Sequence, residues 1–356
     1  MKTVGFITSE TSPGLYRGMD AYAGYLLPPM QKLSSKFDLT VEPVILSHAV
    51  NSPQLDLYHF PTFSFYYPSI PFIFPKPYVV TVHDATRLEF PDKYPSGIRG
   101  RFKLEYQKII LNKSRYVITD SYSSVIQIRR YLGIDHHKIR MIHLAADDIF
   151  KPVKNNLQLR EVARKYLLPP KFILTNGDID WNKNLLNLAK VCNQLKIPLV
   201  VYGKSPRELL DYPEKYNFHH PELSHLALLR QELSSEFIHL LGFIPDSELV
   251  LVFNLAALYC QPAFAEGFGI PILQAMVCEV PVVCSRSHSL PEIAGEAALY
   301  FDPYNIDSIS TSLLRCLDHR SFASQLVKMG KIQARKYSWD QTAEYTLGVY
   351  QEVLIK

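Results

Sequence analysis

Short apolar, β-branched segments alternate with longer amphipathic segments along almost the whole chain, and this alternation limits the possible folds more than any other feature. Segments such as Tyr78 to Val82 and Leu199 to Tyr202 have the length and composition of buried strands. The amphipathic segments between them are long enough to form the crossover helices that parallel strands require. The alternation therefore predicts an α/β protein with mostly parallel sheets.

The expected strands form two series of six, separated by an irregular stretch. The pattern lapses around Asp147 to Pro170, where prolines and asparagines surround a short basic helix from Leu157 to Tyr166. We therefore expect an amino-terminal domain of residues 1–152, a carboxyl-terminal domain of residues 153–336 and a final helix of residues 337–356. The expected strands are Val4 to Ile7, Val41 to Leu46, Leu57 to His59, Tyr78 to Val82, Tyr116 to Thr119, Ile139 to Ile142, Phe172 to Thr175, Leu199 to Tyr202, Ile238 to Leu241, Ala257 to Cys260, Val282 to Cys284 and Leu299 to Phe301.

Composition narrows the class of protein further. Apolar residues make up 47% of the 356 residues and charged residues 20%, which is the balance of a globular protein. The net charge of +4 is spread along the chain without a block of like charges, so nucleic-acid binding is not indicated. No segment reaches the roughly 20 apolar residues that cross a bilayer, and the apolar run at the amino terminus is too short for a signal peptide. The five cysteines lack paired spacing, so we expect a reducing, cytoplasmic location.

The segment Gln261 to Met276 has the form of a loop that follows a strand and opens a helix. Gly267 and Gly269 allow a ligand to approach the backbone, and Pro271 suits a first helical turn. The free N–H groups and the dipole at such a helix start favour phosphate, and the carboxylate of Glu266 could accept hydrogen bonds from sugar hydroxyls. A tight structural turn would need the same glycines, so the segment alone leaves both interpretations open.

The sequence beyond this loop extends the pattern. Pro281 to Ser285 and Ser289 to Pro303 follow in an order that resembles the family 4 glycosyltransferases, and the resemblance runs from about Pro77 to the end of the chain. It implies a retaining transferase with the GT-B fold, in which two Rossmann-like domains with mostly parallel sheets face each other across a cleft. In such folds the last helix crosses back, so residues 337–356 are expected to pack on the amino-terminal domain; an amphipathic helix could also simply cover its own domain. It also implies that a nucleoside diphosphate sugar is the co-substrate, with no metal and no other cofactor.

The resemblance assigns roles to residues of the second half of the chain. Glu266 matches the residue that touches the donor sugar, while Gln274 stands where relatives place a second acidic residue on the ribose. Asn182 and Lys183 stand where relatives carry an Arg-Lys pair that neutralises the diphosphate, and Lys183 still supplies a point charge. The remaining donor-binding positions implied by the loop and helix start are Phe268, Gly269 and Ile270.

Residues of the first half are matched in the same way. Gly14 and Gly18 resemble the glycine loop that lies over the donor diphosphate. His83 ends a predicted buried strand, where α/β proteins bind ligands, and it matches the family's histidine near the donor sugar. Asp84 is expected to support the same loop. Ser121 lies either on the acceptor side or at an ordinary helix start, and both interpretations remain open.

Two features of the first half suggest an acceptor or a membrane. The stretch Tyr58 to Pro68, followed by Phe72 and Phe74, is rich in aromatic residues and is either buried under the sheet or exposed as an apolar groove. Cations then interleave with apolar residues between Arg99 and Arg115, which indicates either a solvated basic helix face or peripheral contact with anionic lipid at the inner face of the cytoplasmic membrane. The interleaved residues are Arg99, Arg101, Phe102, Lys103, Leu104, Lys108, Ile109, Leu111, Lys113 and Arg115.

Together these features predict transfer of a hexose from GDP-mannose or a UDP-sugar to a hydroxyl of a glycan or lipid-linked acceptor, as in polysaccharide biosynthesis. His83 and Glu266 would position the sugar, and the protein's contribution would be positioning and electrostatic stabilisation. Two alternatives remain. One is a nucleotide-sugar epimerase of the same fold. The other is a non-catalytic protein that binds sugar nucleotides, which the departures at Asn182 and Gln274 suggest.

Overall fold

The computed structural model describes residues 1–8, 19–45, 55–67, 70–71, 74 and 76–355. These residues fall into two compact units. Unit 1 comprises Met1–Pro91, Ser96–Ala145 and Tyr337–Lys356, and unit 2 comprises Asp92–Pro95 and Ala146–Lys336. The change of unit at Ala145 precedes the expected boundary at residue 152, and the assignment of residues 92–95 to unit 2 was not anticipated.

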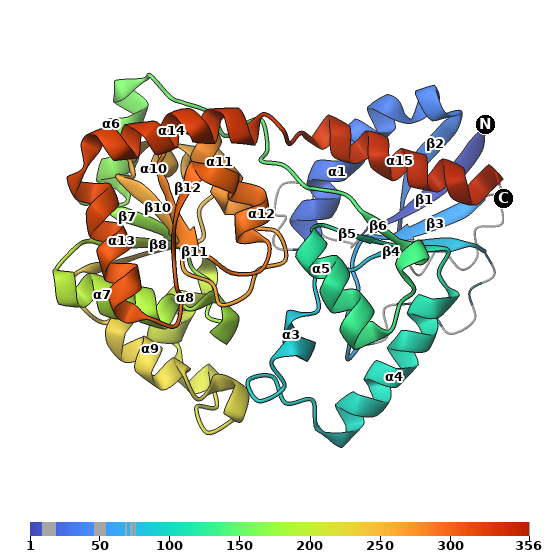
Figure 1. The fold of residues 1–356 in the computed structure, drawn as a ribbon, viewed down its shortest axis with the longest axis horizontal. Coiled ribbons are helices and arrows are strands. Elements are labelled where there is room, and N and C mark those ends of the chain that lie inside the picture. Colours follow the sequence, from blue (N-terminus) through green and yellow to red (C-terminus); the bar gives the residue numbers. More distant parts are fainter. Residues whose placement is uncertain (9–18, 46–54, 68–69, 72–73, 75, 356) are drawn as a thin grey trace. The chain divides into compact units, whose positions relative to one another are not determined.

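Unit 1 is built on a six-stranded sheet in the order β2-β1-β3-β4-β5-β6, and every neighbouring pair is parallel (Figure 1). The central strands β3, β4 and β5 are buried along their whole length, as expected for strands covered by helices on both faces. The strands are β1 Lys2–Thr8, β2 Leu39–Ile45, β3 Leu57–Phe60, β4 Tyr78–Thr81, β5 Tyr116–Thr119 and β6 Ile139–Met141.

Helices from both ends of the chain cover this sheet. The last helix, α15, packs against the first, α1, and the two lie side by side in Figure 1. The hydroxyl of Ser338 accepts a hydrogen bond from the N–H of Gln341 at 3.2 Å and so caps α15. The helices of unit 1 are α1 Met19–Leu33, α3 Thr86–Glu89, α4 Gly97–Lys113, α5 Tyr122–Gln127 and α15 Trp339–Ile355, with shorter helical turns at Ser34–Phe37, Ile128–Leu132 and His136–Lys138.

The aromatic stretch that begins in β3 and continues into the following loop contributes mainly to the core. Tyr58, Phe60 and Phe63 are buried in a cluster with side chains of β4 and α4, whereas Tyr67 is 71% exposed. Phe72 lies outside the described residues. For the described part of the stretch, burial under the sheet is therefore the main role, and Tyr67 is its exposed tip.

A buried polar network fastens α15 to the sheet. The side chain of His59 in β3 is fully buried, and its Nδ1 lies 2.5 Å from the hydroxyl of Tyr350 in α15. Its Nε2 lies 2.7 Å from the Thr81 hydroxyl, which in turn contacts the Tyr22 hydroxyl at 3.3 Å. Burial lowers the pKa of His59 to about 3, so the ring is neutral in the folded protein.

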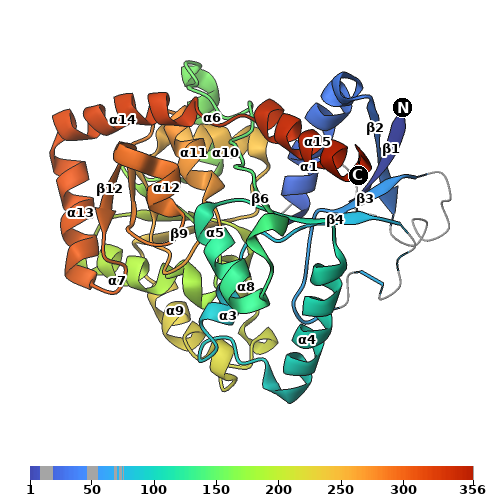
Figure 2. The same ribbon diagram turned by 45° about the vertical axis from the view of Figure 1, so that its right-hand side comes forward.

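Unit 2 repeats the architecture with the strand order β12-β11-β10-β7-β8-β9, again parallel throughout. Figure 2 shows this unit with its helices around the strands. Its strands are β7 Ile173–Asn176, β8 Leu199–Tyr202, β9 Ile238–Gly242, β10 Leu258–Gln261, β11 Val282–Ser285 and β12 Ala298–Phe301. Its helices are α6 Asn156–Lys165, α7 Leu185–Leu195, α8 Lys204–Asp211, α9 Leu226–Leu233, α10 Asp246–Leu255, α11 Ile270–Val277, α12 Leu290–Ala294, α13 Ile306–Asp318 and α14 Arg320–Ala334, with shorter turns at Trp181–Lys183, Pro213–Lys215, Pro221–Leu223 and Gly295–Ala297.

The predicted α/β class with mostly parallel sheets is confirmed, and each expected strand has a counterpart within two residues at either end. All five cysteines are buried and free. In the part of the chain that the structure describes, no helix has the length and apolarity needed to cross a membrane.

We predict that His59 makes the stability of unit 1 sensitive to acid. The unfolded chain protonates this histidine near its ordinary pKa of 6.5, whereas the folded protein does not until about pH 3, so acid favours unfolding. Replacing His59 with glutamine should reduce the loss of unfolding free energy between pH 6.5 and about pH 5 by about 2 kcal/mol relative to the parent protein. Urea unfolding followed by Trp339 fluorescence in a Trp181→Phe background measures this loss, and equal pH slopes in the two proteins would contradict the prediction.

Candidate active site

The candidate donor site of unit 2 starts from two neighbouring strand ends. β7 and β10 lie side by side where the strand order of the sheet reverses, and ligands of open α/β sheets bind beyond the carboxyl ends of strands at such a point. The loop after β7 contains a single helical turn, Trp181–Lys183, and the loop after β10 leads into α11. The two loops therefore emerge together at the edge where a donor would bind.

Asparagine side chains and backbone groups tie these two loops together. The N–H of Phe264 donates to the carbonyl of Asn182 at 2.7 Å, and the Asn182 side chain donates to the Ala265 carbonyl at 3.0 Å. The side chain of Asn184, which has a left-handed backbone with φ of 55°, donates to the Pro262 carbonyl at 2.9 Å. Asparagine is among the few residues that tolerate this conformation, so the sequence is suited to the turn.

The structure gives Asn182 a supporting position. Its side chain is buried, and its oxygen accepts a hydrogen bond from the hydroxyl of Tyr94 at 2.6 Å, while its backbone N–H donates to the same hydroxyl at 3.1 Å. Together with the bond to Ala265, these contacts engage both ends of the amide. Asn182 was expected at the diphosphate, but in the structure it fixes the loop that carries Lys183.

Lys183 and Glu266, which the sequence assigned to separate tasks, form an ion pair. The Lys183 Nζ lies 2.8 Å from one carboxylate oxygen of Glu266, and the side chains are 23% and 13% exposed. The other oxygen accepts a hydrogen bond from the side chain of Gln261 at 3.1 Å. Ion pairs that are largely removed from water are stronger than surface pairs, because solvent and salt screen them less. The pair therefore places one positive and one negative group at the edge of the sheet.

The start of α11 is shaped by Gly269. Its φ of +98° is unfavourable for a residue with a side chain, and an added Cβ would lie 2.8 Å from Leu290. The hydroxyl of Ser289 donates to the carbonyls of Glu266 and Phe268 at 2.7 and 3.0 Å, which fixes the loop just before the helix. In the first turn of α11 Pro271 has no N–H, and the N–H of Ile272 donates to the Gly269 carbonyl at 3.0 Å, so this helix start attracts an anion mainly through the positive end of the helix dipole.

Two other residues that were expected to bind the donor lie near the start of α11. Gln274 is buried in the second turn of α11, and Phe268 is buried in the loop. The N–H of Asp180 donates to the carboxylate of Asp178 at 3.1 Å, so this pair forms a turn. Among the described residues, no group of three or more His, Cys, Asp or Glu side chains has the arrangement of a metal site.

Sequence reasoning missed an aromatic stack beside the two loops. The ring of Phe264 stacks on Trp181 with centroids 4.5 Å apart, and on Tyr304 with centroids 4.6 Å apart. These rings come from three separate segments of unit 2, so no local spacing in the sequence relates them. Offset stacking of this kind adds roughly 1 kcal/mol per pair beyond the burial of area. The stack therefore stiffens the loops that carry Lys183 and Glu266.

In unit 1, His83 pairs with Asp120, a contact that the sequence did not predict. His83 and Asp120 follow the adjacent strands β4 and β5, and the Nδ1 of His83 lies 2.6 Å from the Asp120 carboxylate. The two side chains are 18% and 3% exposed. The ring of Tyr22 packs edge-on against the imidazole with centroids 4.8 Å apart. The polar residue at the end of each strand was the signal that could have identified Asp120.

The charge of His83 is set by this pairing. Burial would lower the pKa of the imidazole, but the carboxylate of Asp120 raises it, with a smaller contribution from Asp84, and the resulting pKa lies above its ordinary value. Because Nδ1 faces Asp120, this nitrogen carries a proton and the ring has a fixed orientation. Asp120 therefore fixes the imidazole of His83 at the carboxyl end of the sheet, with a proton on Nδ1.

The remaining predicted residues of unit 1 serve the backbone or lie outside the described chain. The Asp84 carboxylate accepts a hydrogen bond from the N–H of Thr86 at 2.9 Å and so supports the loop, as expected. The buried hydroxyl of Ser121 accepts from the N–H of Ser124 at 3.1 Å and caps α5, which favours the helix-start interpretation. Gly14 and Gly18 lie outside the described residues.

Comparison with known proteins gives the family. Residues 160–333 match the model described as glycosyl transferases group 1, and residues 3–149 match that of glycosyltransferase family 4. The chain belongs to the group 1, family 4 glycosyltransferases. Together the two matches cover most of both units.

Its relatives include bacterial mannosyltransferases. The chain is similar to the O-antigen chain mannosyltransferase B of Escherichia coli, with 29% identity over 280 residues that cover 77% of this chain and 70% of the relative. It is also similar to the serotype-specific mannosyltransferase WbdA of Escherichia coli, with 28% identity over 282 residues. That match covers 78% of this chain but only 33% of WbdA, so the chain corresponds to about a third of the longer protein.

Solved structures share the fold at low sequence identity. The sucrose-phosphate synthase from Thermosynechococcus elongatus superposes with a TM-score of 0.73 and 15% identity, covering all of both chains. Alr3699/HepE from Anabaena, in complex with UDP-glucose, superposes with a TM-score of 0.69 and 15% identity, covering 99% of this chain and 100% of the other. The two-sheet GT-B architecture of this glycosyltransferase is thus shared with these proteins.

We predict that Asn182 contributes to stability as well as to any binding. Replacing Asn182 with alanine removes the acceptor of the Tyr94 hydroxyl and the side-chain donor to the Ala265 carbonyl, which should lower the unfolding free energy of unit 2 by about 2 to 3 kcal/mol. Urea unfolding followed by Trp181 fluorescence in a Trp339→Phe background measures the loss. The control is Asn187→Ala, because Asn187 makes only a 3.4 Å bond to the Pro303 carbonyl, and its loss should stay below about 1 kcal/mol. Equal losses in the two variants would contradict the structural role.

Proposed function

We propose that this glycosyltransferase moves a hexose, with mannose as the first candidate, from a nucleoside diphosphate sugar to a hydroxyl of a glycan or lipid-linked acceptor, with retention at the anomeric carbon. The observation that carries the proposal is the Lys183–Glu266 ion pair at the strand ends where the sheet order of unit 2 reverses. The names of the mannosyltransferase relatives support mannose and a role in polysaccharide biosynthesis. GDP-mannose and UDP-sugars are the donors to test first.

The ion pair suggests how the donor is received. In the structure Lys183 and Glu266 satisfy each other's charge. A bound diphosphate would attract the ammonium of Lys183, and the Glu266 oxygen released from the pair would then accept a hydrogen bond from a sugar hydroxyl. Donor binding would thus replace the Lys183–Glu266 contact by two others, one between Lys183 and the diphosphate and one between Glu266 and the sugar. Gln274, one turn into α11, is the residue we assign to the ribose.

The transfer step requires charge stabilisation on the departing diphosphate. Lys183 and the positive end of the α11 dipole supply positive charge for it, and we propose that no metal ion is needed. In a retaining reaction without a protein nucleophile, the acceptor attacks from the face of the leaving group and a diphosphate oxygen takes its proton. His83, held by Asp120, is assigned to positioning the sugar for this step.

An epimerase would use similar phosphate-binding parts, and a binding protein would use them without turnover. The relatives named as mannosyltransferases favour the transferase over both. The departure at Asn182 no longer favours a non-catalytic protein, because that side chain has a structural task of its own. The requirement for an acceptor separates the transferase from the epimerase, since epimerisation consumes no acceptor.

We predict that one nucleotide diphosphate and its sugar conjugate will raise the melting temperature through Lys183. A ligand that binds only the folded state stabilises it by mass action, so a screen of GDP, UDP, ADP and their common sugar conjugates should reveal the base. Lys183→Met should abolish this shift and lower kcat/KM by about 100-fold or more, whereas Lys190→Met in α7 should leave both unchanged. With the identified donor, the product should have the anomeric configuration of the donor by NMR and form equally well in excess chelator.

Several results would contradict the proposal. Stabilisation by a nucleotide without transfer to any acceptor across a panel of glycans and lipid-linked sugars would favour the binding protein. Conversion of the donor sugar in the absence of any acceptor would favour the epimerase. Inversion at the anomeric carbon, or loss of activity with chelator, would reject the corresponding part of the mechanism.

We also propose that α4 contacts the membrane that holds a lipid-linked acceptor. Ile98, Phe102 and Ile109 are exposed on this helix, between exposed cations such as Arg101 and Lys103. Apolar side chains that enter the headgroup region beside cations that meet anionic lipid form the usual pattern of peripheral binding.

We predict that Phe102→Ser will reduce sedimentation with phosphatidylglycerol vesicles at low salt at least several-fold, because the side chain is 74% exposed and its transfer into lipid is lost. Leu228→Ser in α9 of unit 2, where the leucine is 52% exposed, is the control and should bind as the parent does. If the parent protein does not sediment with anionic vesicles, the membrane contact is excluded.

A further inference from the structure

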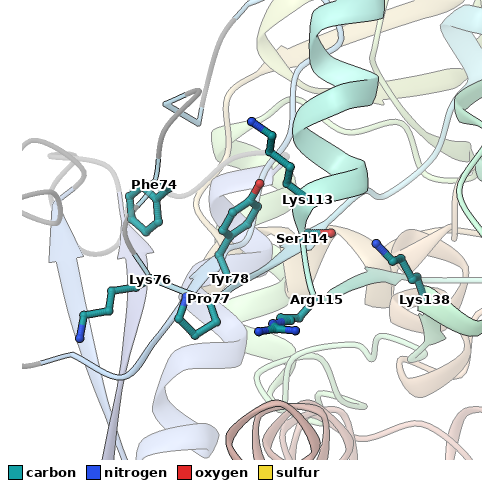
Figure 3. Close-up of a pocket in the computed structure, with 8 residues that line it drawn as sticks. All are labelled: Phe74, Lys76, Pro77, Tyr78, Lys113, Ser114, Arg115 and Lys138. Carbon is teal, nitrogen blue, oxygen red and sulfur yellow. The ribbon is translucent and has the colours of Figure 1, made fainter. Parts of the chain in front are cut away.

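A cavity of about 510 Å³ opens at the amino-terminal edge of the sheet in unit 1 (Figure 3). It is formed where the segment before β4, the end of α4 and the turn before β6 come together. His83 and Asp120 follow the opposite ends of β4 and β5, so the cavity is separate from the candidate active site. Its lining consists of Phe74, Lys76, Pro77, Tyr78, Lys113, Ser114, Arg115 and Lys138.

The lining of this cavity is strongly basic. Four of its eight residues are lysine or arginine, and none is acidic. Figure 3 shows Lys113 and Arg115 on either side of Ser114, with Lys138 beside them and Lys76 at the far side. Four cations around one hollow repel each other, and the arrangement is stabilised when an anion enters. The planar guanidinium of Arg115 matches the oxygens of a phosphate group, and the ammonium groups add point charge.

The carboxyl end of α4 lies at the cavity, and its carbonyl groups would repel an anion if they were left exposed. Hydrogen-bond donors occupy these carbonyls. The Tyr78 hydroxyl donates to the Ile110 carbonyl at 2.7 Å, and the Ser114 hydroxyl donates to the Leu111 carbonyl at 2.6 Å. The Lys138 ammonium donates to the Asn112 carbonyl at 2.6 Å, and an ammonium has two further N–H groups. The last carbonyls of the helix are thus capped by donors, which also fixes the position of Lys138.

The carboxylate that acts on Lys76 is already engaged. Lys76 contributes to the lowered pKa of Asp56, whose largest cause is a backbone hydrogen bond. The two oxygens of Asp56 accept hydrogen bonds from the N–H of Thr3 and the Nζ of Lys2, each at 2.9 Å. The negative charge of Asp56 is therefore largely balanced by these contacts and does little to neutralise the cations of the cavity. Arg115 and Lys138 lie across the cavity from Lys76.

We propose that this basic cavity is a second anion site of the protein, which binds a phosphate-bearing ligand with at least two negative charges. The shared chemistry is a diphosphate or a phosphorylated headgroup, which is either a free small molecule or part of a lipid. All residues that line the cavity belong to unit 1, whereas the candidate donor site lies in unit 2. The proposal therefore does not depend on which sugar donor the protein uses. Arg115 and Lys138 are its principal ligands.

Calorimetric titration with inorganic pyrophosphate at low salt tests the free-ligand form. The titration uses a Lys183→Met background, so that the candidate donor site does not compete. The expected result is one binding event that weakens at least tenfold in Arg115→Gln and further in Arg115→Gln/Lys138→Gln, because each loses a charge-assisted hydrogen bond. Arg129→Gln/Arg130→Gln in the helical turn Ile128–Leu132 removes the same charge outside both the cavity and α4, and should change the affinity less than twofold. Arg115→Gln alone preserves the capping bond of Lys138, so it reports on binding even if the double variant is unstable.

Sedimentation with vesicles of phosphatidylglycerol or phosphatidylcholine tests the lipid form with the same variants. Loss of pyrophosphate binding in the cavity variants but not in the control pair supports a free phosphate ligand. Loss of phosphatidylglycerol binding in the cavity variants but not in the control pair supports a headgroup. If the cavity variants bind both probes as the parent does, if the control pair weakens binding equally, or if neither probe binds the parent, the proposal is wrong.

Discussion

Parallel pairing of short buried strands is the constraint on which the rest of this molecule depends. A parallel strand cannot be joined to its neighbour by a tight turn, so each connection crosses over through a helix and every strand of a sheet ends at the same edge. Residues that follow different strands are thereby collected at one edge, however far apart they are in the sequence. The ends of β7 and β10 give Lys183 and Glu266, and the ends of β4 and β5 give His83 and Asp120.

Both of these pairs show how a polar site is kept stable without a ligand. A charge that leaves water is costly unless it finds a partner, and each pair supplies one at 2.8 or 2.6 Å. The surrounding loops are fixed by neutral groups: the buried amide of Asn182 and the stacked ring of Phe264. The neutral amide of Asn182 suits this buried position, because it accepts from one neighbouring group and donates to another.

The two edges of the sheet in unit 1 have different electrostatic characters. At the carboxyl edge, His83 is paired with a carboxylate and packed against an aromatic ring, which gives a compact group of fixed orientation. At the amino edge, the cations around Arg115 surround an open cavity with no acidic residue in its lining. The strand direction separates the two, so an anion bound at one edge does not occupy the other. This separation leaves room in one unit for both the proposed sugar-positioning residue and the proposed anion site.

The sequence by itself determined the α/β class, the family and the positions of the strands that the structure describes. Strand length, apolar composition and the turn at Gly269 are local properties, so they can be recognised in short stretches of sequence. It also indicated Lys183, Glu266 and His83 as polar residues after buried strands. Only the tertiary structure decided that Lys183 meets Glu266, that Asp120 holds His83, that Asn182 supports a loop, and that Arg115 and Lys138 share a cavity. The physical reason is that these contacts join segments from different strands and helices, and their geometry is fixed by strand order and packing, which no local pattern in the sequence encodes.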